Sequence, residues 1–201
     1  MDRRRWMGVL FAVGSACFAL GAAPGYVDAA GVAADGITFF VGSVFFTSAA
    51  ALQLLDAAGR RGSNDWWASL IQLAGTLFFN LSTFDEMLEH LSAKQDDRLV
   101  WTPDAFGSIC FLVASGLAWA AVVHGWWGWH PWVRDWQIAG LNLAGSIAFG
   151  ASAVASYVVP ASDQPRNATM MNLGTFIGAL CFLAGALLLL PRPASEPAPA
   201  G

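Results

Sequence analysis

One segment of the sequence gathers side chains that are able to carry chemistry. It reads FDEMLEHLSAKQDDRLVW and places Asp85, Glu86, Glu89 and His90 within six consecutive residues. On a helix, residues four positions apart share a face, so Glu86 lies beside His90. Carboxylate and imidazole groups at this spacing can hold a divalent cation.

A credible metal site usually needs three or four ligands that converge from more than one element. Here one short segment supplies all the obvious ligands. The favoured interpretation is therefore a solvated acidic helix end. A metal site formed by Glu86, Glu89 and His90 is the alternative, and with it a metal-dependent membrane enzyme.

A second group of polar side chains lies inside apolar stretches. Gln72, Thr76 and Asn80 recur at helical spacing along one face, and Asn142 and Asn172 lie in later apolar stretches. Amide side chains cannot face lipid without a large cost, so they need polar partners. Hydrogen bonding between helices is the favoured interpretation. A polar cleft that receives a small neutral solute or a lipid headgroup is the alternative.

Several classes of activity are disfavoured by what the sequence lacks. The central parts of the apolar stretches contain no Asp, Glu, Lys or Arg, whereas ion-driven carriers of charged substrates place ionisable groups at membrane depth. No phosphate loop or zinc-protease motif appears, and a net charge of −4 offers no basic patch for nucleic acid. We expect no cofactor, no nucleic-acid partner and no enzymatic activity.

The elements that must position these residues are membrane helices. Hydrophobic residues make up 56% of the 201 residues and charged residues only 12%, against about 25% charged in soluble domains. Apolar stretches of about 20 residues are long enough to cross a bilayer. The spans are expected at 6–23, 37–55, 66–84, 105–123, 136–158 and 170–190. The sequence predicts one all-α polytopic helix bundle over residues 1–190, and a disordered proline-rich tail over 191–201.

A short motif recurs in these stretches. GSACF, GSVFF, GTLFF, GSICF and GSIAF all place a glycine, a hydroxyl residue and a phenylalanine at fixed spacing, and the sixth stretch has GTFIG. Small residues let helix backbones approach closely in membranes, and a buried hydroxyl can donate to its own helix backbone. The glycines expected at helix contacts are Gly14, Gly42, Gly75, Gly107, Gly145 and Gly174.

The order of the hydroxyl residues is Ser, Ser, Thr in the first three stretches and again in the last three. This order predicts two halves of three helices, which would be inverted relative to each other. Inverted repeats are common in secondary transporters. Small-residue motifs are also ordinary packing devices, and packing is the favoured reason for them.

The basic residues predict the orientation. With the N-terminus inside, the inner segments hold seven of the ten Lys and Arg residues and the outer segments hold three. Positive residues in short loops stay on the cytoplasmic side. Both termini are therefore expected in the cytoplasm.

The patterns GSVFF, GSICF and GSIAF within hydrophobic hairpins resemble the YrhK-like membrane domain family, whose helices carry similar glycine, serine and aromatic stretches. The resemblance implies a multi-pass protein of the bacterial inner (plasma) membrane. It implies no catalytic residues.

Taken together, these features favour a structural, regulatory or accessory component of the membrane. Its expected partners are the lipid bilayer and either a second copy of itself or another membrane protein. A transporter or channel for a small neutral solute is the alternative.

Overall fold

The computed structural model describes residues 2–87, 91–123, 127–162 and 164–191. Six long helices dominate it: α1 (Arg3–Gly21), α3 (Val32–Ala57), α4 (Asn64–Asp85), α6 (Thr102–Val122), α7 (Arg134–Ser156) and α8 (Ala168–Leu189). The short elements are α2 (Tyr26–Ala30), η1 (Ala58–Arg60), α5 (Ala93–Asp96), η2 (Asp97–Trp101), β1 (Val158–Val159) and β2 (Gln164–Pro165). The predicted all-α helical bundle is confirmed.

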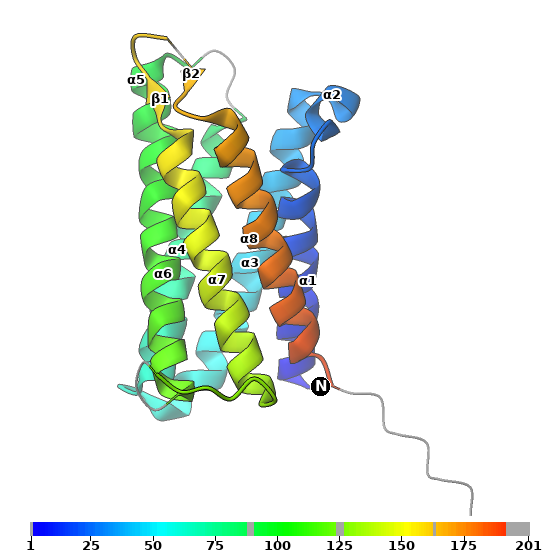
Figure 1. Ribbon diagram of the computed structural model, residues 1–201, viewed down its shortest axis with the longest axis vertical. Helices are drawn as coiled ribbons and strands as arrows, with labels where there is room; N and C mark the ends of the chain where they lie inside the picture. Colours follow the sequence, from blue (N-terminus) through cyan, green and yellow to red (C-terminus); the bar gives the residue numbers. More distant parts are fainter. Residues whose placement is uncertain (1, 88–90, 124–126, 163, 192–201) are drawn as a thin grey trace, which may run out of the picture.

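The long helices form a closed ring. Each packs against the next long helix in the chain, and α8 packs against α1 to complete the circle (Figure 1). The chain alternates in direction, so the start of α1 and the end of α8 lie at one end of the bundle. We call this the terminal end. The opposite end, which carries α2, α5 and the two short strands, is called the loop end.

Four helical segments in the described parts of the chain are long and apolar enough to cross a membrane: Val32–Arg60, Ala93–Val122, Arg134–Ser156 and Ala168–Leu189. The helices α1 and α4, of 19 and 22 residues, are not among these four segments. Arginines open α1, and α4 contains Gln72 and Asn80. The structure is thus a helical bundle with four candidate membrane spans.

Close glycine contacts divide the ring into three hairpins. A Cβ built at Gly14 would lie 2.9 Å from the carbonyl oxygen of its partner glycine, and the corresponding distances are 3.1 Å at Gly107 and 3.0 Å at Gly145. No side chain fits there without displacing its neighbour, so the backbones touch at these points. The glycine pairs are Gly14 with Gly42, Gly75 with Gly107, and Gly145 with Gly178. The hairpins are therefore α1 with α3, α4 with α6, and α7 with α8.

This pairing differs from the predicted two inverted halves of three helices, which the structure does not support. The sixth motif also differs from the prediction. It is GALCF, in which Gly178 makes the contact and Ala179 takes the place of the hydroxyl residue. Gly174 packs against α7 as well, since its Cβ would lie 2.9 Å from the Cβ of Ser152. The glycine therefore defines the repeat, and the hydroxyl residue is replaceable.

The phenylalanines of the six motifs fill the axis of the ring. They form two layers of three, in which each ring contacts one ring from each of the other two hairpins. One layer is Phe18, Phe79 and Phe149, and the other is Phe46, Phe111 and Phe182. Within each hairpin the two rings meet across the layers, with centroids 5.1 to 5.5 Å apart. We call these six residues the phenylalanine cluster. It follows an approximate threefold pattern.

The predicted hydrogen bond from a motif hydroxyl to a backbone carbonyl of its own helix is confirmed for three of the motif residues. Ser43 donates to the carbonyl of Phe40 and Thr76 to that of Leu73, both at 2.8 Å, and Ser146 donates in the same way to Asn142. Two of these hydroxyls also bond across hairpins: Ser43 with Thr83 at 3.1 Å, and Ser146 with Ser115 at 2.7 Å.

The hydroxyls of Ser15 and Ser108 are buried and have no hydrogen-bond partner among the described residues. The threefold pattern explains the second case. The partner of Ser43 is Thr83, which lies on the first helix of the next hairpin, seven residues after the motif residue Thr76. For Ser108, the equivalent position on the first helix of the next hairpin is Ala153, seven residues after the motif residue Ser146. The alanine side chain has no hydroxyl that could pair with Ser108.

We expect Ser43→Ala to lower the free energy of unfolding by about 0.6 kcal/mol, the average for a hydrogen bond between membrane helices. Ser108→Ala removes a buried hydroxyl that lacks a partner, so it should leave stability unchanged or raise it. Thermal unfolding of the two variants in detergent measures the difference. Equal losses in both would contradict the assigned pairing.

Candidate functional site

A cavity of about 420 Å³ opens at the terminal end of the ring, and all six long helices contribute to its lining. Its inner end is formed by Phe11, Phe46 and Phe182. Two of these belong to the phenylalanine cluster, which therefore closes the cavity toward the loop end. We call this cavity the vestibule.

Three amide side chains line the vestibule walls: Gln53 from α3, Gln72 from α4 and Asn142 from α7. Gln53 Nε2 lies 3.4 Å from Ser69 Oγ and 3.5 Å from Gln72 Oε1. These separations exceed the usual 2.7–3.2 Å of an N–H···O hydrogen bond. Gln53 and Gln72 are therefore loosely paired and can turn toward a bound solute.

Charged side chains of both signs surround the mouth. The lining includes Arg4, Asp56, Arg60, Asp65 and Asp135. Two ion pairs link these residues, Arg4 with Asp135 at 3.4 Å and Arg60 with Asp65 at 3.6 Å. A third joins Asp56 to Arg3 at 3.6 Å. The first and last turns of the helices thus place opposite charges side by side around the opening.

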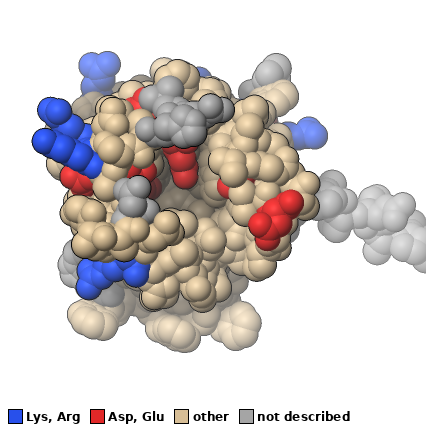
Figure 2. All heavy atoms as spheres, turned by 90° about the horizontal axis from the view of Figure 1, so that it is seen from above, with Lys and Arg blue, Asp and Glu red and all other residues tan. Residues whose placement is uncertain are grey.

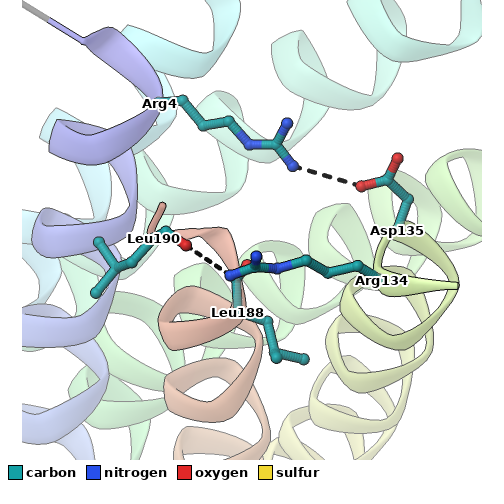
Figure 3. A network of polar contacts seen from close by, with 5 residues as sticks. All are labelled: Arg4, Arg134, Asp135, Leu188 and Leu190. Atoms are coloured by element: carbon teal, nitrogen blue, oxygen red, sulfur yellow. Dashed lines mark hydrogen bonds and ion pairs between the residues drawn. The ribbon is translucent and has the colours of Figure 1, made fainter. Parts of the chain in front are cut away.

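A neighbouring arginine has a different role. Arg134 donates to the backbone carbonyls of Leu188 and Leu190, at the end of α8 (Figure 3). The last carbonyls of a helix lack partners within the helix, so this contact caps α8. Figure 3 shows Arg4 and Asp135 directed toward each other beside this cap. Arg134 is engaged in holding α8, whereas Arg4 and Asp135 face the opening.

The structure brings together part of the predicted polar cleft. Gln72 and Asn142 line the vestibule. Thr76 is fully buried. Asn80 lies eight residues beyond Gln72 on the same helix, about 12 Å along its axis, and its buried Oδ1 has no partner among the described residues. Asn172 is exposed near the start of α8.

The sequence interpretation missed the charged residues at the mouth. From the sequence, basic residues such as Arg4 predict only the orientation, and no role is predicted for Asp135. The available signal was that arginines and aspartates recur within the first or last turn of several helices that end on the same side. Their meeting across the opening follows from ring closure.

The acidic segment at the loop end is described only in part. Glu89 and His90, two of the three predicted metal ligands, lie outside the described residues. Among the described residues, no group of three or more His, Cys, Asp or Glu side chains could hold a metal ion. Figure 2 shows Asp and Glu side chains inside a hollow at this end, with Lys and Arg on its outer sides.

Glu86 lies at the loop end, directly after α4. Its pKa is raised to about 7, first by partial removal from water and then by the charges of Asp104, Asp35 and Asp96. The side chain remains reachable by solvent. The raised pKa means that Glu86 is partly protonated at neutral pH. A metal site at Glu86, Glu89 and His90 stays a prediction.

Comparisons with protein family models, with curated proteins and with solved structures give no match to this chain. The resemblance to the YrhK-like family therefore stays a prediction.

Proposed function

We propose that the protein is a membrane transporter for a small solute without net charge, and that the solute binds in the vestibule. The observation that carries this proposal is a cavity on the axis of a helix ring. Amide side chains line its walls, charged side chains surround its mouth, and phenylalanine rings close its inner end. Its volume falls within the range of sites for small molecules, about 300–1,000 Å³.

The sequence alone favours a structural, regulatory or accessory component. Helix packing accounts for the glycine contacts and for the phenylalanine cluster. It does not account for Gln53, Gln72 and Asn142 around a cavity, because amides buried in a bundle normally satisfy one another at short distance. The vestibule thus supports the transport alternative.

We infer that all six long helices cross the membrane. At 1.5 Å per residue, the 19 residues of α1 and the 22 of α4 extend about 28 and 33 Å. These lengths suit a hydrocarbon core of about 30 Å. Both helices also stand in the same ring as the four apolar segments, so they occupy the same depth.

The terminal end would face the cytoplasm of a bacterial cell. Arg3, Arg4, Arg60 and Arg134 all lie at this end, as the rule for basic residues requires of a cytoplasmic side. In this orientation the vestibule is open to the inside. The phenylalanine cluster is then the barrier that separates the bound solute from the outside.

Transport is tested by solute entry into proteoliposomes. We expect liposomes that contain the protein to reswell after hyperosmotic shock with glycerol, urea or glycine faster than empty liposomes, for at least one of these solutes. Ala118→Trp, which places an indole in the vestibule lining of α6, should abolish the difference.

The matched control is Val113→Trp, which introduces the same indole on the outer face of α6, where Val113 is 45% exposed. This variant should keep the rate of the unaltered protein. If no solute enters faster than in empty liposomes, the transport proposal fails and a structural role is the better interpretation.

A further inference from the structure

The chemistry of the vestibule mouth narrows the class of solute, provided that the proposed transport function is right. The lining residues Arg4 and Arg60 supply guanidinium groups, and Asp56, Asp65 and Asp135 supply carboxylates. Both charge signs are therefore available within one opening. Among small molecules without net charge, only a zwitterion uses both.

The ion pairs at the mouth are loose. Arg4 and Asp135 approach to 3.4 Å, and Arg60 and Asp65 to 3.6 Å, whereas a well-formed charged hydrogen bond measures about 2.7–2.9 Å. The side chains of Arg4 and Asp135 are 55% and 67% exposed. Exposed pairs of this kind contribute little to stability. Each partner can therefore exchange the other for a charge on a ligand at small cost.

Arg4 and Asp135 also come from separate hairpins, α1 and α7. A ligand with an ammonium and a carboxylate group can bridge them, with the carboxylate on the fork-shaped guanidinium of Arg4 and the ammonium on Asp135. Further inside, the amides of Gln72 and Asn142 offer hydrogen bonds, and Phe46 and Phe182 offer an apolar end.

We propose that the vestibule binds a small zwitterion with an apolar body, of the size and chemistry of an aliphatic α-amino acid. The two charged groups of the ligand exchange with the Arg4–Asp135 pair, and the apolar body extends inward from the mouth into the vestibule. A zwitterion leaves the net charge of the vestibule unchanged. A lone cation or anion would pair with only one of the two residues, so it would form one charged contact where a zwitterion forms two.

The test compares four probes that all contain the isobutyl group of leucine and differ in charge. They are leucine, the cation leucinamide, the anion N-acetylleucine and the uncharged 4-methylpentanamide. Binding to the purified full-length protein in detergent is measured by calorimetric titration and by the shift of the melting temperature. We expect leucine to bind at least tenfold more tightly than each of the other three.

Two variants and one control test whether the ligand binds at Arg4 and Asp135. Arg4→Gln and Asp135→Asn should each weaken leucine binding at least tenfold, since each removes one charged hydrogen bond. Arg5→Gln removes the same charge from an exposed neighbour outside the vestibule lining, so it should leave the affinity unchanged. The double variant Arg4→Asp with Asp135→Arg restores both charges and should recover binding to within a few-fold.

The outcomes separate this inference from the transport proposal. If 4-methylpentanamide binds as tightly as leucine, selectivity for a zwitterion is excluded. If Arg4→Gln leaves the affinity for leucine unchanged, binding at the Arg4–Asp135 pair is excluded. Transport is decided separately, by solute entry into proteoliposomes. If glycerol or urea enters proteoliposomes and leucine does not bind, the zwitterion is excluded while transport stands. If leucine does not bind and no solute enters, the transport proposal fails as well.

Discussion

Replacing Phe111 with Ala is expected to lower the free energy of unfolding by about 3–5 kcal/mol, the usual cost of removing a buried phenyl ring. Phe111 is 2% exposed. Its ring centroid lies 5.1 Å from that of Phe79, 5.7 Å from Phe182 and 6.2 Å from Phe46. These neighbours are themselves held by backbone glycine contacts, so they cannot easily close the gap that alanine would leave.

The control for this prediction is Phe106→Ala on the same helix. Phe106 is 52% exposed and stacks on Phe78 outside the phenylalanine cluster. We expect a loss no larger than about 1.5 kcal/mol, the upper value for an aromatic pair. Unfolding in detergent, followed by near-ultraviolet circular dichroism, measures both variants. If the two losses are equal, the phenylalanine cluster is not the stabilising core of the bundle.

Replacing Gly178 with Ala is expected to destabilise the protein by about 1–3 kcal/mol, the usual cost of overpacking a dense interior. The added Cβ would lie 2.7 Å from Cε1 of Phe149 and 3.0 Å from the carbonyl oxygen of Gly145. In a helix interior without such a contact, alanine is more stable than glycine by about 1 kcal/mol. A net loss of stability in Gly178→Ala therefore shows that the close contact outweighs this preference. The larger substitutions Gly75→Leu and Gly145→Leu should lose more.

Gly140→Ala, one helix away on α7, is the matched control. Its Cβ would meet only the outer end of the Trp119 side chain, at 3.3 Å. A small movement of the indole relieves this contact, so the helix preference for alanine should leave stability unchanged or raise it. The melting temperatures of Gly178→Ala and Gly140→Ala in one detergent check the contrast. A stable Gly178→Ala protein would show that the α7 and α8 backbones do not touch.

Much of the architecture follows from local features of the sequence. Stretches of about 20 apolar residues predict helices of membrane length because helix formation depends on neighbouring residues and on the backbone alone. The motif glycines were likewise predictable as contacts, and Gly14, Gly42, Gly75, Gly107 and Gly145 all make them. The hydroxyl bond within a helix, as from Thr76 to Leu73, spans three residues and is equally local.

The grouping of the helices was not predictable from the order of the hydroxyl residues. That order predicted two inverted halves, whereas the backbone contacts make three hairpins. The reason is that a close approach requires only the absence of a side chain, as at Gly178. Ala179 beside it is fully buried without a hydroxyl, so the hydroxyl pattern carried no information on pairing.

The candidate site likewise has features that the sequence predicts and features that only the packing of the helices determines. Composition and spacing alone determined that amides such as Gln72 and Asn142 lie in membrane-length helices and need polar surroundings, because transfer of an amide from water is costly wherever the chain folds. Only the tertiary structure decided that these two share a cavity while Asn80 and Asn172 do not. It also brought Arg4 to Asp135, 131 residues away. Such pairs depend on the closure of the helix ring, which is a property of packing between distant segments and leaves no periodic signal along the chain.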